Sequence, residues 1–422
     1  MDKKKRHNPW IWVPGIFATE GVVSATVTYV SLLMFIQLGA SYAFATLLSA
    51  SLLLLSIVKQ FNFLGNKFNK FLKIFTISLQ FLLFIAFIFT AHMVNSFKTG
   101  IVIPFACLMA VALINAFNEK CVFRYYNNIL NRQKQKVLGN YKFVASQISF
   151  IVTYGILIIF VGLHEIFFRN LRLAWTTAFY LIAGVIMTLI IVNAFLLKKP
   201  NKVNEVDYLK PRPKSLPKKI LIRNGRFLFI IFMLLLPQAL MFASRVLFLM
   251  ASEDEGGLGC TLQDVGFAQG TIGVIAFSIA TLIGQHLMRK FGQKRLFWIM
   301  ILPLIISPVF YLIMNFLMRT DLLSICIMTF AAQFCFGFGL NICVVFINRT
   351  NQVFEDNIIN LIHNPIVVAA MFIPIACSGW LINILGFKWF FMINASAAIL
   401  SILTLIINYK FIVRHILNYK TI

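Results

Sequence analysis

The chain has 422 residues, of which 60% are hydrophobic and only 12% are charged, and its mean hydropathy is +0.86. Soluble domains carry about twice this share of charge, so the composition excludes a water-soluble enzyme and predicts an all-α polytopic membrane protein. The formal net charge of +25 would suggest a nucleic-acid partner in a soluble protein. We expect none here, because the positive charge sorts to one side of the predicted membrane helices.

Continuous apolar stretches, interrupted by clusters of charge, predict the order of the transmembrane helices. The first stretch follows four cationic residues, as a secretory signal would, but it is too long for one, so we expect a retained helix. The twelve predicted helices cover residues 10–38, 42–64, 71–94, 100–119, 143–164, 174–197, 226–250, 265–288, 295–316, 321–347, 361–384 and 388–413.

Charges within the first four predicted helices are candidate functional groups, because an unpaired charge in hydrocarbon costs several kcal/mol. Glu20 in the first helix either binds a proton or substrate, or is a structural acid tied to a neighbouring helix. Lys59, near the cytoplasmic end of the second helix, either functions there or reaches the membrane surface. Glu119 closes the fourth helix and shares a helical face with Asn115 and Asn118. It is either a second proton site or a solvated helix end.

The longest polar interruption, residues 198–226, contains four prolines and ten Lys or Arg residues. Proline at this spacing predicts an extended linker. We therefore expect an N-terminal six-helix bundle (1–197), a cytoplasmic basic linker (198–225) and a C-terminal six-helix bundle (226–422). Transporters built from such halves bind substrate near the membrane midplane and alternate access by rocking.

The seventh helix contributes the remaining candidates, Gln238 and Arg245. The Arg245 guanidinium could bind a carboxylate or phosphate of a substrate, or it could extend to the outer surface. A direct ion pair with Glu20 is not expected, because the two residues should differ in depth by about 16 Å. In the eighth helix, Gly266 and Gly270 predict a close approach of another helix.

Thirty-one of the 38 Lys and Arg residues fall on one side of the predicted helices and five on the other. Cationic loops stay in the cytoplasm, so we expect both termini there, in a bacterial inner membrane with anionic lipid as a partner. The seven cysteines form no paired framework and no metal-binding spacing, so we expect no disulfide, metal or cofactor.

Several strings in the chain are similar to a known family. The twelve-helix layout resembles the major facilitator superfamily, and the strings resemble its AmpG-like muropeptide permease branch. They are residues 8–14, 18–21, 255–259, 264–267, 270–274, 333–339, 378–381 and 386–388. The second half of the chain matches better than the first. In the fourth helix the pair Asn118 and Glu119 keeps one acid of the branch, while Phe123 replaces another.

The resemblance implies proton-driven import of peptidoglycan fragments, anhydro-sugar peptides, by a transporter that we expect to be monomeric. It assigns Glu20 and Glu119 to proton or substrate handling and Arg245 to an anionic group of the substrate. A membrane enzyme is not expected, because the scattered His and Cys residues do not converge at one depth. A degenerate transporter kept as a receptor or scaffold is the alternative, given the missing acids.

Overall fold

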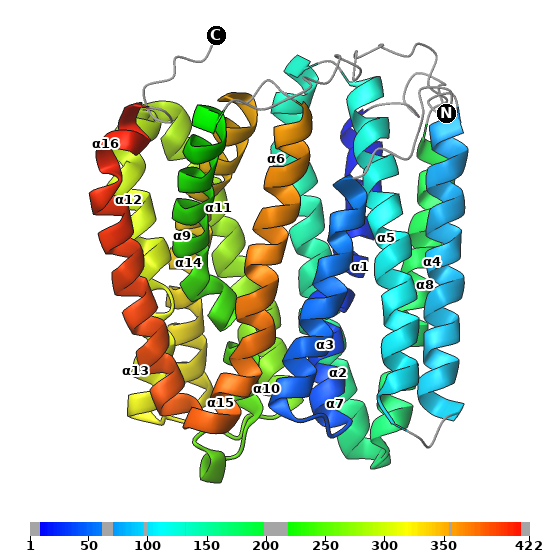
Figure 1. The fold of residues 1–422 in the computed structure, drawn as a ribbon. Coiled ribbons are helices and arrows are strands. Elements are labelled where there is room, and N and C mark those ends of the chain that lie inside the picture. Colours follow the sequence, from blue (N-terminus) through cyan, green and yellow to red (C-terminus); the bar gives the residue numbers. More distant parts are fainter. Residues whose placement is uncertain are drawn as a thin grey trace. The chain divides into compact units, whose positions relative to one another are not determined.

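The computed structural model describes residues 9–60, 71–96, 100–130, 132–197, 218–353 and 357–414, and within them every regular element is a helix (Figure 1). Ten of these helices are long and apolar enough to cross a membrane. Large apolar side chains are widely exposed, among them Phe167 at 79% and Ile407 at 75%. Such a surface is suited to lipid rather than to water.

Two further crossings complete the predicted set of twelve. A shorter apolar helix covers Tyr42–Val58. The long element α15 (Asn357–Ile407) contains two helices that meet at Gly386, whose φ of 74° and ψ of 166° are not helical. The described part of the chain therefore holds twelve apolar helices in the predicted order, which confirms the all-α membrane fold.

The described chain divides into two compact units by its internal contacts. The first unit comprises Met1–Ala40, Ser51–Asp207 and Thr261–Thr271. Its elements are α1 (Pro9–Ala25), η2 (Thr26–Val30), α2 (Ser31–Gln37), η3 (Leu55–Gln60), α4 (Leu72–Ser96), α5 (Val102–Ile129), α6 (Arg132–Phe150), η5 (Ile151–Ile156), α7 (Leu157–Phe168), α8 (Leu171–Leu196) and α10 (Leu262–Val265). A core around Trp12, Phe17 and Tyr125 joins α1 to α5.

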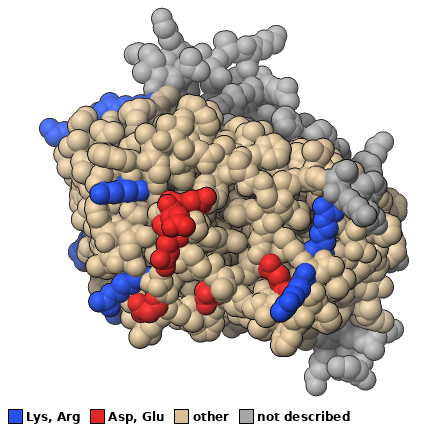
Figure 2. All heavy atoms as spheres, turned by 90° about the horizontal axis from the view of Figure 1, so that it is seen from below, with Lys and Arg blue, Asp and Glu red and all other residues tan. Residues whose placement is uncertain are grey.

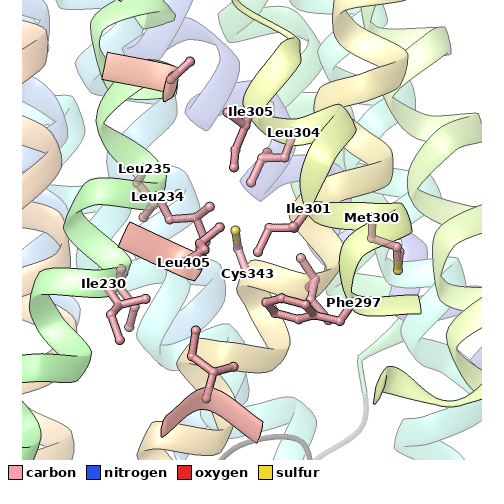
Figure 3. Close-up of a cluster of buried hydrophobic side chains, with 14 of the residues drawn as sticks. Ile230, Leu234, Leu235, Phe297, Met300, Ile301, Leu304, Ile305, Cys343 and Leu405 are labelled. Atoms are coloured by element: carbon pink, nitrogen blue, oxygen red, sulfur yellow. The ribbon is translucent and has the colours of Figure 1, made fainter. Parts of the chain in front are cut away.

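The second unit comprises Ser41–Ala50, Tyr208–Cys260 and Ile272–Ile422. Besides α15, its elements are α9 (Lys218–Met250), η6 (Glu253–Glu255), α11 (Val274–Phe291), α12 (Gln293–Ile306), α13 (Val309–Leu317), α14 (Leu322–Val353) and α16 (Tyr409–Ile412). Figure 3 shows Leu234 of α9, Ile301 of α12, Cys343 of α14 and Leu405 of α15 pointing into one apolar cluster. Two elements, α3 (Tyr42–Leu54) and η7 (Gly266–Gly273), contribute residues to both units.

Glycine permits a close helix crossing within the first unit, as predicted for the eighth helix. A Cβ atom on Gly266 would lie 3.0 Å from the Gly155 carbonyl oxygen, and one on Gly155 would lie 2.6 Å from Thr271 Oγ1. One on Gly270 would overlap the Tyr154 carbonyl. The two backbones approach closely because both helices place glycine where they cross.

A similar crossing within the second unit seats the start of α3 against α15. A Cβ atom on Gly379 would lie 2.5 Å from Thr46 Oγ1, which donates a hydrogen bond to the Ala376 carbonyl at 3.2 Å. Tyr42 Oη donates to the carboxylate of Glu255 in the acidic turn η6. Figure 2 shows acidic side chains on the face that is seen from below. The hydrogen bonds of Thr46 and Tyr42 anchor residues 41–50 in the second unit.

Helix boundaries differ from expectation in α6 and α5. The helix α6 begins at Arg132 although the predicted span begins at residue 143, and α5 continues to Ile129 although the predicted span ends at Glu119. The polar residues beyond that point do not end the helix, because packing buries them: Arg124 is 8% and Asn128 is 5% exposed. The basic linker predicted for residues 198–225 lies largely outside the described residues, and the division of the chain there stays a prediction.

Outside the apolar spans, Asp321 begins α14 as its N-terminal cap. Its Oδ2 accepts a hydrogen bond of 2.9 Å from the Ser324 backbone N–H. The hydrogen bonds from Ser324 hold the pKa of the Asp321 carboxyl below its usual value. The cap satisfies a backbone donor that the first turn of a helix leaves unpaired.

Candidate functional site

The carboxylate of Glu119 is the centre of a polar cluster between two membrane helices of the first unit. Asn115, one turn earlier on α5, donates from Nδ2 to Glu119 Oε1 at 2.8 Å. Ser24 on α1 donates from Oγ to the same oxygen at 3.3 Å. One carboxylate oxygen thus accepts from both helices. The cluster therefore ties α1 to α5 through an acid.

Two asparagines of this cluster bury polar atoms that have no hydrogen-bond partner among the described residues. Asn115 is 6% exposed and its Oδ1 lacks a donor. Asn118 is fully buried, and both its Oδ1 and its Nδ2 lack partners. A buried polar atom without a hydrogen bond costs about 1–3 kcal/mol. Buried polar atoms in this state are commonly completed by a water molecule or an ion.

Glu20 lies four residues before Ser24 on α1, so helical geometry places the two side chains on one face. It is half-buried. The adjacent Gly21 lies against α6, where a Cβ atom would be 2.7 Å from the Ser146 carbonyl oxygen. Pro14 is accommodated within a continuous α1. The helix register thus directs Glu20 toward the side of α1 that carries Ser24.

Arg245 and Gln238 belong to α9 in the second unit, so they are described apart from the two glutamates. Gln238 Nε2 donates to the Leu304 carbonyl of α12 at 2.5 Å. Arg245 is half-buried, and its guanidinium carbon lies 6.0 Å from the centre of the Phe242 ring. Gln238 is thereby engaged in helix packing. The backbone of Lys59 belongs to η3, and its side chain lies outside the described residues.

A buried polar network on the first helix was not predicted. Asn193 of α8 is fully buried and donates from Nδ2 to Gln80 Oε1 at 3.1 Å and to Thr19 Oγ1 at 3.3 Å. Gly15 leaves room for it, since a Cβ atom there would lie 2.6 Å from Asn193 Oδ1. The signal in the sequence was a pair of amides, Gln80 and Asn193, inside apolar stretches. This network joins α1, α4 and α8.

Replacing Asn193 with Ala should destabilise the protein by about 1–3 kcal/mol, because Gln80 Oε1 and Thr19 lose a buried partner. The check is the melting temperature of the purified variant in detergent. Thr188→Ala is the matched control on α8, since Thr188 is exposed and its hydroxyl donates to the Gly184 carbonyl of its own helix. Equal melting temperatures for the Asn193→Ala variant and the wild type would contradict this role.

In the part of the chain that the structure describes, the predicted site residues coincide neither with a group of metal-binding side chains nor with the cavity that lies between α13 and α14. Among the described residues no three His, Cys, Asp or Glu side chains are grouped so as to hold a metal ion. A cavity of about 190 Å³ lies between α13 and α14, lined mainly by apolar side chains and Arg319. None of its lining residues belongs to the predicted site. The candidate functional site is therefore the Glu119 cluster.

The chain is similar to proteins of one known family. A model described as Major Facilitator Superfamily matches residues 129–354, more than half of the chain. No curated protein matches. The crystal structure of a D-xylose–proton symporter is similar, with a TM-score of 0.63 and 14% identity over 93% of this chain and 95% of that one.

Two other solved transporters share the arrangement. The nucleoside transporter NupG has a TM-score of 0.60 and 14% identity, covering 98% of this chain and 100% of its own. A bacterial homologue of the human lysosomal transporter Spinster has a TM-score of 0.52 and 12% identity over 97% and 99%. Identities this low establish a shared fold alone. Together with the family match, they show that this multi-pass membrane protein belongs to the major facilitator superfamily.

Proposed function

We propose that the chain is a secondary active transporter that imports peptidoglycan fragments and is driven by protons. The observation that carries the coupling is the Glu119 carboxylate, held in a membrane helix by hydrogen bonds from Asn115 and Ser24. A carboxylate in hydrocarbon is expensive and is commonly part of a proton or substrate pathway. The substrate class rests on the sequence strings that resemble the muropeptide permease branch.

Protonation of Glu119 would change the bonding between α1 and α5. As an anion, its Oε1 accepts from both Ser24 and Asn115, and it attracts these donors strongly because it is charged. As a neutral acid it is a weaker acceptor, and the link between the two helices loosens. Proton arrival and release thereby bias the relative position of two helices, which is what coupling to transport requires.

The remaining candidates are assigned by chemistry. Arg245 is proposed to bind the carboxylate of the peptide portion of the substrate, because guanidinium and carboxylate match in geometry and charge. Glu20, on the face of α1 that carries Ser24, is proposed to bind substrate hydroxyl groups or a proton. The similarity in fold to a D-xylose–proton symporter and a nucleoside transporter supports a polar, sugar-containing solute.

We also propose that the protein works as a monomer in a bacterial inner membrane, with both termini in the cytoplasm. The charge distribution along the sequence supports this orientation. The alternating access of the family would then expose Glu119 to each side in turn.

The wild-type protein is expected to accumulate labelled anhydro-muropeptide in proteoliposomes when a pH gradient, acid outside, is imposed. Accumulation should disappear when a protonophore collapses the gradient, while downhill exchange of the label persists. A labelled disaccharide without peptide is the matched comparison, because it lacks the carboxylates proposed to meet Arg245. Muropeptide binding without any uptake or exchange would overturn the proposal and favour the receptor alternative.

A further inference from the structure

The cavity of about 190 Å³ in the second unit opens where residues 318–321 connect α13 to α14. Figure 1 places α13 at the end of this unit opposite to α16. An apolar cavity of about 150 Å³ can hold a benzene ring, so this space can take a short piece of hydrocarbon chain. Its walls favour such an occupant, because most of the lining side chains are apolar: Met314, Leu317, Ile325, Ile327 and Met328.

The surface around the cavity is suited to lipid. Leu323 is 71% exposed, Ile327 is 58% exposed and Leu317 is 56% exposed. Apolar side chains of this size and exposure are stable in the hydrocarbon of a bilayer rather than in water. The connection at residues 319–321 is exposed and polar, so the boundary between membrane and water passes close to the mouth of the cavity. Hydrocarbon that enters from this side therefore belongs to an acyl chain, with its headgroup at the connection.

The mouth of the cavity carries one charge of each sign. Arg319 is exposed and lines the cavity. Asp321 follows two residues later, also exposed, and its Oδ2 accepts from the backbone N–H of Ser324, another lining residue. A guanidinium and a carboxylate thus stand side by side above an apolar space, and their formal charges cancel.

The other charged groups near this end of α13 lie on a different face of the helix. Asn315 Nδ2 donates at 3.4 Å to the carbonyl of Gly256, which follows the acidic turn η6. Lys388 Nζ lies 5.9 Å from the centre of the Phe316 ring. Positions 314 and 317 are within about 60° of each other around the helix, whereas positions 315 and 316 point away from them. The mouth therefore stays neutral overall, which suits a zwitterionic headgroup better than an anionic one.

We propose that this cavity binds a phospholipid whose zwitterionic headgroup carries a primary ammonium, as in phosphatidylethanolamine. One acyl chain occupies the cavity, the Arg319 guanidinium binds the phosphate, and the Asp321 carboxylate accepts hydrogen bonds from the ammonium. A choline headgroup has no N–H to donate, and a glycerol headgroup has no positive charge. This site is independent of the substrate and of the coupling ion proposed above.

The test follows the melting temperature of the full-length protein in detergent during titration with dioctanoyl phosphatidylethanolamine, phosphatidylcholine or phosphatidylglycerol, which have identical acyl chains. A saturable rise is expected at the lowest concentration with phosphatidylethanolamine. Arg319→Gln and Asp321→Asn should each raise its half-saturating concentration at least about tenfold, because each removes a hydrogen bond between charged groups. Asp321→Asn keeps the start of α14 intact, since Asn caps a helix as well as Asp does.

Arg169→Gln is the matched control for the loss of a positive charge. Arg169 is likewise exposed in a short connection between two helices, directly before the Asn170 cap of α8, but it does not line the cavity. Its lipid response should equal that of the wild type. Met328→Trp tests the apolar part of the site, because the larger ring would fill the cavity. The variant should lose the response to all three lipids.

An equal response of the wild type to the three lipids, or a stronger one to phosphatidylglycerol, would overturn the proposal. An unaltered preference in both Arg319→Gln and Asp321→Asn would also overturn it, because the lipid would then bind elsewhere. Should Met328→Trp fail to fold, binding of radioactive phosphatidylethanolamine to the wild type and to Arg319→Gln decides the question, and equal binding to both contradicts the site. A rise with muropeptide that Met328→Trp abolishes would instead assign the cavity to the substrate.

Discussion

Replacement of Glu119 by Gln is expected to lower proton-driven accumulation of muropeptide strongly while leaving the protein folded. The Gln side chain keeps the size of Glu and an oxygen that can accept from Asn115 and Ser24, but it cannot gain or lose a proton. Coupling between two ligands typically changes binding about 5- to 150-fold, so accumulation in proteoliposomes under an imposed pH gradient should fall by a factor in this range. Downhill exchange should continue.

Glu165→Gln serves as the control in this assay. Its carboxylate is half-buried on α7 and accepts from Gln37, whose Oε1 accepts in turn from Trp175 Nε1 at 3.0 Å. It matches Glu119 in burial and in having an amide donor, but not in its place in the cluster. Unchanged accumulation in both Glu119→Gln and Glu20→Gln would remove these carboxylates from proton handling.

Gly270→Ala is expected to destabilise the first unit by about 1–3 kcal/mol, because overpacking forces the backbones apart. The added Cβ would overlap the carbonyl group of Tyr154, which is backbone and cannot rotate away. Tyr154 cannot yield easily in other ways, since its ring stacks on Tyr29 with centroids 4.6 Å apart. The measurement is the melting temperature of the variant in detergent, with uptake as a second readout.

Gly184→Ala is the matched control for this substitution. Gly184 also lies in a membrane helix of the first unit, but a Cβ atom there would meet nothing within 4 Å. The change to Ala should be neutral or stabilise the helix by up to about 1 kcal/mol, because Ala is the better helix former. A loss of stability as large in Gly184→Ala as in Gly270→Ala would show that the crossing is not the cause.

The number and order of helices could be predicted from hydropathy, because the cost of exposing backbone to lipid leaves helices as the form that such apolar stretches take. The glycine crossing at Gly266 and Gly270 could also be predicted, since their spacing of four residues places both on one helix face. Helix ends could not, as α5 shows. Hydropathy registers the charge of Arg124 but not the neighbours that bury it.

The candidate site could likewise be predicted in part from the sequence. The spacing of Asn115 and Glu119 on one helix predicts that they can meet, and they do. Ser24 could not be identified as their partner, because that contact depends on how α1 packs on α5. Asn193 shows the same limit: a polar residue in an apolar stretch is visible in the sequence, while the partners that satisfy it are set by the packing of three helices.

Gly386 and Gly292 have a consequence for how the second unit can move. Each joins two successive helices through one residue, and their φ and ψ values, 74° and 166° for Gly386 and 79° and 156° for Gly292, are accessible essentially to glycine alone. A connection of one residue is too short to let one helix shift along the other. Rearrangements of this unit should therefore carry α11 with α12, and the two arms of α15 together, as stiff hairpins that travel as pairs.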